Sequence, residues 1–309
     1  MHETKLTAGQ KTGTKRTPFV ITPVHALLLR DLNTLQRATA EQLTRLNYKM
    51  GMLTTVKQRL KDLADNRYAL PLSHPSIRLP YLYALDRRGL NYLAAQGVDV
   101  REYFRPSQEE DTAKNFLFRE HMLAISDILI HSLLFVKSAA SYRIETMLHE
   151  RYFKNHPVKV VSGRDSREET KTIVPDAYLA FACTGKSGKE DIIPVLWELD
   201  RGTEDQKFFR KRVRAYIVFL KSRAFKTLFD IENITVAFAT TRDHYRVRQM
   251  REWTRKELAL TNEPAWLADL FLFTALPENI GEREPRQLFL DPVWYTPADD
   301  ENPVSLLGE

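Results

Sequence analysis

The sequence predicts an α+β or α/β fold in which a small, mainly helical N-terminal unit precedes a larger mixed α/β domain. The chain of 309 residues is long enough for two domains with separate cores. Its first third shows apolar residues at helical spacing, followed by two runs in which apolar and polar residues alternate. The remainder alternates between apolar, strand-like runs and basic amphipathic stretches, a pattern typical of a mixed sheet with helices on its faces.

The positive charge of the chain is concentrated in its first third. Residues 1–106 contain 17 Lys and Arg against 8 Asp and Glu, and the remainder contains 29 against 32, which together give the net charge of +6. A local excess of this kind favours a polyanionic partner, because basic side chains that bind phosphates release condensed counterions. A basic surface that serves only solubility is the alternative.

Cysteine content and hydropathy indicate where in the cell the protein is expected. Cys183 is the single cysteine and lies in an apolar run, so no internal disulfide forms and the thiol is expected to serve packing. No apolar run approaches the roughly 20 uncharged residues of a membrane span, and the first residues lack the apolar core of a secretory signal. We therefore expect a cytoplasmic protein without membrane contact.

The N-terminal third has the pattern of a helix-turn-helix. Residues 1–20 are polar and basic and are expected to form a disordered tail. A first helix is expected over residues 23–33, and Thr39 begins a second, short helix that ends near Leu46. A third helix over residues 53–66 has apolar residues at helical spacing, namely Leu53, Val56, Leu60 and Leu63.

Two alternating runs after the third helix predict a β-wing, which completes a winged helix over residues 21–105. The runs flank a polar tip at Ser73–Ser76. In winged helices the third helix enters the major groove of double-stranded DNA. The candidate base readers are Thr54, Thr55 and Gln58, and the candidate phosphate contacts are Lys57, Arg59, Lys61 and Arg78. A winged helix that binds protein is the alternative.

The second domain is expected over residues 112–295, with a flexible tail over 296–309. A long helix over 112–136 places Glu120, Asp127 and His131 on one face, either near a metal site or as a polar stripe at the surface or a domain interface. Residues 159–171 are expected to form an exposed loop. Strands are expected over 142–148, 173–183, 192–199, 234–240 and 270–275, with basic helices from about residue 204 and over 242–260.

Three carboxylates accompany the two central strands, which read as a hairpin. Asp176 follows Pro175 at the start of the first strand, and Glu198 and Asp200 lie at the end of the second. Because side chains alternate along a strand, Glu198 and Asp200 face the same side. Converging carboxylates can bind Mg²⁺ or Mn²⁺ and activate water against a phosphodiester, with Glu120 as a further metal ligand.

This hairpin resembles the PD-(D/E)xK nuclease superfamily, although Asp200 stands where that motif has its lysine. Lys207 or Lys211 in the following basic helix would then supply the missing charge. The string ELDRGTE (198–204), followed by a basic helix with Tyr216, resembles more narrowly the replication-relaxation family of bacterial plasmids and integrative elements. That resemblance implies a winged helix joined to a restriction-endonuclease-like domain, and a replication initiator or relaxase as partner.

Three functions remain open at this point. In the first, the protein is a DNA-binding accessory of plasmid or mobile-element replication or relaxation. A homodimer that binds two paired half-sites is compatible with this function. In the second it is a metal-dependent endonuclease or nickase with Asp176, Glu198 and Asp200 as catalytic ligands. In the third it is a transcriptional repressor. The acids do not decide between the first two, because Arg201, Arg210 or Lys211 could neutralise them without a metal.

Overall fold

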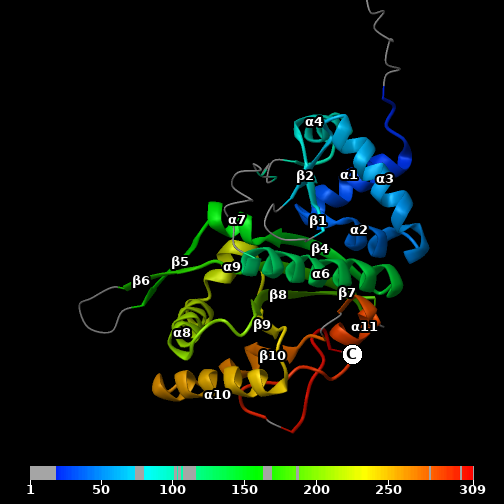
Figure 1. Ribbon diagram of the computed structural model, residues 1–309. Coiled ribbons are helices and arrows are strands. Elements are labelled where there is room, and N and C mark those ends of the chain that lie inside the picture. The colour runs from blue at the N-terminus through cyan, green and yellow to red at the C-terminus, as the bar shows by residue number, and fades with distance from the viewer. Residues whose placement is uncertain are drawn as a thin grey trace, which may run out of the picture.

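The computed structural model describes residues 19–73, 80–100, 103, 106, 116–162, 169–185, 188–277, 280–299 and 301–308. Figure 1 shows a group of short helices at one end of the molecule, a mixed sheet in the middle, and α10 at the other end. The predicted mixed α/β class is confirmed.

The N-terminal unit consists of four helices and a small sheet. The helices are α1 (Pro23–Leu35), α2 (Ala40–Asn47), α3 (Leu53–Asp65) and α4 (Arg87–Ala95), with a short 3-10 helix, η1 (Met50–Met52), before α3. The strands β1 (Ala38–Thr39), β2 (Ala69–Leu72) and β3 (Leu82–Leu85) pair in the order β1-β3-β2. Thr39 caps α2 with the predicted capping box, since its hydroxyl accepts from Gln42 N at 3.1 Å while the Gln42 side chain accepts from Thr39 N at 3.0 Å.

This order of elements is compatible with a winged helix, whose identity as a DNA-binding module stays a prediction. Parts of that prediction lie outside the described residues, namely the tip at 74–79 with Arg78, residues 1–18 of the tail, and most of the linker.

A five-stranded sheet forms the centre of the second part of the chain. Its strands are β4 (Tyr142–His149), β7 (Ala177–Thr184), β8 (Glu190–Asp200), β9 (Thr235–Thr240) and β10 (Phe271–Ala275), in the order β10-β9-β8-β7-β4. Strands β4, β7 and β8 pair antiparallel, whereas β8, β9 and β10 run parallel. The parallel pairs are connected through α8 (Gln206–Ser222) and α10 (His244–Leu260), because parallel neighbours need a crossover. The further helices are α6 (Phe116–Ser138), α7 (Glu150–Asn155), α9 (Ala224–Phe229), α11 (Pro285–Phe289) and the short 3-10 helices η2 (Ala265–Leu270) and η3 (Ile280–Glu282).

The alternation of side chains along β7 and β8 separates the two faces of the sheet. Leu179, Trp197 and Leu199 belong to the core that includes α6, and Tyr178 and Leu196 belong to the core under α8 and α10. Glu198 and Asp200 have the parity of Leu196, so they lie on the face that α8 and α10 cover, as the alternation predicts. Figure 1 shows α6 and these two helices on opposite sides of the sheet.

The prediction of an exposed loop over residues 159–171 is wrong for its two ends. Antiparallel strands β5 (Val158–Ser162) and β6 (Glu169–Ile173) form a separate two-stranded sheet there. Val158, Val160 and Ile173 are buried in the core beneath α8, whereas Lys159 is exposed. Only one face of this two-stranded sheet is covered, so polar residues occupy the positions between the buried ones. These polar residues made the segment resemble a loop in the sequence.

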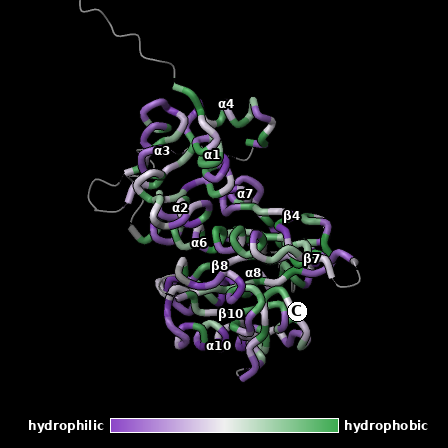
Figure 2. Tube along the Cα trace, turned by 90° about the vertical axis from the view of Figure 1, so that its right-hand side faces the viewer, coloured by the Kyte–Doolittle hydropathy of each residue, from purple (hydrophilic) through white to green (hydrophobic). Residues whose placement is uncertain are grey.

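Helix α6 packs between the N-terminal unit and the sheet. Among the described helices it is the one long and apolar enough to cross a membrane. Its Ile128, Leu129 and Phe135 are fully buried in a core that continues into α1, α2 and α3. Figure 2 shows the hydrophobic colour of α6 between the two parts of the molecule.

The C-terminal segment differs from the free tail that the sequence predicts over residues 296–309. Trp294 and Val304 form an isolated β-bridge, and Leu307 N donates to Phe289 O at 3.0 Å. Leu306 and Leu307 are each 5% exposed and join the core on the α6 side of the sheet. The acidic, Pro-containing composition of this segment predicts a free tail, but its Leu306 and Leu307 pack into the core of the sheet.

Replacing Leu306 by alanine tests this packing. The loss of a buried leucine side chain should lower the free energy of unfolding by about 2–4 kcal/mol, as for other core leucines. Urea denaturation followed by circular dichroism measures the change, with the exposed Glu301→Ala as a control expected to stay within about 0.5 kcal/mol. Equal stability of the two variants would show that the segment is free.

Candidate functional site

Asp176 is fixed at the point where the hairpin strands meet. Asp176 N donates to Trp197 O at 3.0 Å, and its carboxylate accepts from Leu199 N at 2.7 Å, which ties it to the end of β8. The other carboxylate oxygen lies 2.9 Å from His121 Nε2 on α6. Although burial opposes the charged imidazole, the hydrogen bond and charge of Asp176 raise the pKa of His121 above its ordinary value. The pair is therefore a partly buried contact between α6 and the sheet, which becomes an ion pair when His121 is protonated.

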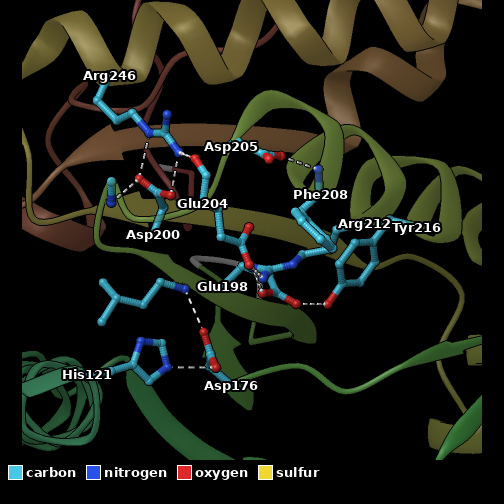
Figure 3. A network of polar contacts seen from close by, with 12 residues as sticks. His121, Asp176, Glu198, Asp200, Glu204, Asp205, Phe208, Arg212, Tyr216 and Arg246 are labelled. Atoms are coloured by element: carbon cyan, nitrogen blue, oxygen red, sulfur yellow. Dashed lines mark hydrogen bonds and ion pairs between the residues drawn. The ribbon is translucent and has the colours of Figure 1, made fainter. Parts of the chain in front are cut away.

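Glu198 is bound by two side chains from one face of α8. Arg212 Nη1 donates to its carboxylate at 2.8 Å, and the Tyr216 hydroxyl donates to the other oxygen. Arg212 also binds Glu204. Burial raises the pKa of Glu198 to about 7, against the lowering effects of Arg212 and of the Tyr216 hydrogen bond. Figure 3 shows this cluster beside Asp176.

Asp200 is held by a bidentate arginine. Arg246 donates from Nε to Oδ2 and from Nη2 to Oδ1, both at 2.8 Å. Gly202 N and the Thr240 hydroxyl donate to Oδ2 at 2.9 Å and 3.1 Å. Asp200 is 3% exposed, so such complete pairing is what its burial requires. Figure 3 shows Arg246 reaching this carboxylate from α10.

The turn after Asp200 requires a glycine. Gly202 has a φ of +69°, and a Cβ at this position would stand 2.7 Å from Arg242 Cγ. Glu204, two residues on, accepts from Arg246 through its backbone carbonyl at 3.0 Å. The string ELDRGTE thus supplies three carboxylates and one turn to a single polar network.

The arrangement of the acids does not fit a divalent cation. Both oxygens of Asp176, of Glu198 and of Asp200 are engaged by the donors described above, and Arg246 occupies Asp200 on both oxygens. Within the described ranges, no group of three or more His, Cys, Asp and Glu side chains is placed so that it could hold a metal ion. A hard cation needs free oxygen ligands. In this conformation the acids form a network of ion pairs.

The helical acids proposed as metal ligands are paired with basic side chains. Glu120 pairs with Arg201, and Asp127 accepts from Gln42 Nε2 at 2.9 Å and from Arg45. His131 is buried against Arg283 O at 3.3 Å, and burial lowers its pKa to about 4. The interpretation of this stripe as a domain interface therefore agrees with the contacts of Asp127.

Two clefts open on either side of Asp176. One, of about 530 Å³, lies between Leu35–Arg37 of the N-terminal unit and helices α6 and α7. The other, of about 660 Å³, lies against β6 and α8 and is lined by Asp176, Glu198, Glu204, Phe208 and Lys211. Lys211 thus lies in the same cleft as two of the acids, whereas Lys207 is exposed on α8 and does not line it.

The basic side chains that neutralise the hairpin acids are mostly ones that the sequence pattern did not indicate. Of the residues proposed for this role, Arg201 binds Glu120 and Arg210 binds Glu257. Arg212 and Arg246 take it instead. Arg212 and Tyr216 are four residues apart and so share one face of α8, a spacing that offered a signal for Glu198. The sequence contained no signal for the pairing of Arg246 with Asp200, because only the parallel pairing of β8 and β9 brings α10 to Asp200.

The exposed face of α3 carries the residues proposed to contact DNA. Thr54, Thr55, Lys57, Gln58 and Lys61 are exposed. Gln58 Nε2 donates to Asp62 Oδ1 at 2.9 Å, and Arg59 Nη1 lies 3.6 Å from the same carboxylate. Asp62 therefore holds two of the proposed DNA contacts.

Replacing Glu198 by glutamine tests the buried acid network. The folded-state pKa of Glu198, about 7, lies above the unfolded value of about 4.3. The stabilisation by protonated Glu198 is therefore fully present below about pH 4.3 and is lost as the pH rises through about 7. Glu198→Gln removes this dependence. Between pH 4.5 and 7.5 its free energy of unfolding should gain about 3 kcal/mol relative to wild type. Urea denaturation at both pH values measures the change, with Glu301→Gln as the exposed control, and parallel pH profiles would contradict it.

The comparisons with known proteins agree with the resemblance of the sequence. The model of the replication-relaxation family matches residues 29–230, which is more than half of the chain and spans both α3 and the acid network. No curated protein and no solved structure matches the chain. The description of the family names replication and relaxation. The chain is a member of the replication-relaxation family.

Proposed function

We propose that the protein is a DNA-binding accessory of plasmid or mobile-element replication, in which the N-terminal unit acts as a winged helix and holds double-stranded DNA through α3. The observation that carries this proposal is the exposed face of α3, where hydroxyl, amide and ammonium groups gather on a helix whose other face is buried. Such a face offers both base and phosphate contacts. The basic balance of residues 1–106 supports the same partner.

The contacts of α2 with α6 support a fixed position of α3 on the rest of the molecule. Gln42 and Arg45 bind Asp127, and Lys137 Nζ donates to Leu46 O at 3.0 Å. The Ser126 hydroxyl donates to Arg37 O at 3.1 Å. A helix held in this way presents the bound DNA in one orientation to the clefts beside Asp176. In this proposal the second domain is a docking platform for DNA or for a replication initiator or relaxase, in the cytoplasm.

A metal-dependent endonuclease is the second candidate. One observation favours it, since Asp176, Glu198 and Lys211 line the same cleft. The full pairing of all three acids opposes it, because Arg212 and Arg246 would have to release Glu198 and Asp200 before a cation could bind.

Replacing Lys57 and Lys61 by glutamine tests the proposed DNA face. The loss of two phosphate contacts should weaken binding to all duplex sequences, and the slope of log K against log salt should fall by about 2. Fluorescence anisotropy at several salt concentrations measures both effects. A matched control is Lys159→Gln with Lys189→Gln, which removes the same charge from β5 and the β7–β8 turn. An unchanged slope in the α3 variant would exclude this face.

Replacing Asp62 by asparagine tests how the α3 side chains are held. The substitution removes the charge that pairs with Arg59 and weakens the bond to Gln58. We expect duplex binding to strengthen about threefold to tenfold, since a repulsive carboxylate leaves the phosphate-facing helix. The same anisotropy titration measures this, and equal or weaker binding would mean that Asp62 orients these side chains for DNA.

Titration of Mn²⁺ separates the two candidate functions. We expect wild type and Glu198→Ala to give the same calorimetric response and no metal-dependent nicking of supercoiled plasmid, because arginines occupy Glu198 and Asp200 while His121 and Leu199 N occupy Asp176. Metal binding that is lost in Glu198→Ala, together with nicking that requires the metal, would establish the endonuclease.

A further inference from the structure

A basic surface lies at the carboxyl ends of the parallel strands, next to the Asp200–Arg246 end of the acid network. We call it the α10 surface. It consists of two hollows of about 590 Å³ and 670 Å³ that share His244 at the start of α10. The first is lined by residues that follow β9 and β10, and the second by the side of α10 and Tyr295. Crevices at the carboxyl ends of parallel strands are where α/β sheets commonly bind ligands.

Three arginines of the α10 surface have no acidic partner. Among the described residues, no carboxylate lies within ion-pair distance of Arg242, Arg248 or Arg283, and all three are exposed. Arg242 Nε donates only to a backbone carbonyl, Arg201 O, at 2.9 Å. The two hollows place these side chains around one end of α10.

Two further arginines line the α10 surface and are oriented by backbone carbonyls. Arg251 Nε donates to Thr296 O and Arg255 Nε donates to Pro297 O, both at 2.8 Å.

Among the described residues, the acids that line the α10 surface are engaged elsewhere and do not pair with Arg242, Arg248 or Arg283. Asp243 accepts from Arg246 N at 3.2 Å as the cap of α10, and Glu252 pairs with Lys256 at 2.6 Å. Arg246 also lines the surface but is neutralised by Asp200. This contrasts with the hairpin cleft, where Arg212 faces two carboxylates. Uncompensated guanidinium groups around a hollow fit phosphate, which they bind through paired N–H donors.

The α10 surface lies far from the proposed DNA face. Figures 1 and 2 both place α3 at one end of the molecule and α10 at the opposite end, with the sheet and α6 between them. A duplex seated on α3 therefore leaves the α10 surface open to another segment.

We propose that the α10 surface binds the phosphate backbone of a second DNA segment, so that one chain holds two duplexes together. The proposal rests on the proposed binding of the first duplex by α3. Its chemistry is independent of sequence, since the surface offers guanidinium groups to phosphates, and it needs neither a metal nor the acids of the hairpin.

A bridging assay tests the proposal. One duplex is immobilised on beads, the protein is added, and retention of a second, fluorescent duplex is measured. Wild type should retain the second duplex. The double variant Arg248→Gln with Arg283→Gln should lose about tenfold in retention, while its affinity for a single duplex, measured by anisotropy at low protein concentration, changes less than about twofold. Lys159→Gln with Lys189→Gln, which changes the net charge equally, should bridge like wild type.

Two results would overturn the proposal. One is a wild type that binds a single duplex without retaining a second, and the other is retention that survives in Arg248→Gln with Arg283→Gln. Calorimetric titration with inorganic pyrophosphate tests the α10 surface independently of the α3 site. If wild type binds no duplex, binding of pyrophosphate that Arg248→Gln with Arg283→Gln abolishes still supports the phosphate site, and absence of that binding refutes it.

Discussion

The structure depends on the neutralisation of carboxylates that are buried along one hairpin. Asp176, Glu198 and Asp200 are between 3% and 9% exposed, and ionised groups at such positions are costly unless each has a charged or hydrogen-bonding partner. The partners come from three separate helices: His121 from α6, Arg212 from α8 and Arg246 from α10. The acids therefore fix how all three helices close onto the two faces of the sheet, in addition to the apolar packing beneath them.

The same pairing bears on function. A nuclease centre keeps carboxylate oxygens available to a cation, whereas these oxygens already accept from guanidinium, imidazole, hydroxyl and backbone donors. Among the residues that the structure describes, basic side chains without an acidic partner lie elsewhere, on α3 and around the start of α10. This distribution separates basic surfaces on the N-terminal unit and on α10 from a paired acid network in the part of the molecule that connects them.

Helix α6 makes that connection. Its apolar side chains pack against both the N-terminal helices and the sheet, and its polar side chains, notably Asp127, bind α2. The N-terminal helices and the sheet thus share one packed core around α6.

The sequence by itself determined the order and type of most elements, since their signals are local. Examples are the helix start at Thr39 and the apolar run of β8. It also indicated that Glu198 and Asp200 share a face, and the family to which the chain belongs. Only the tertiary structure decided which cations meet these acids, that β5 and β6 pair, and that Leu306 and Leu307 complete the core. Those contacts join residues far apart in the chain, such as Asp200 and Arg246, and no local pattern encodes them because strand order and helix packing determine which residues meet.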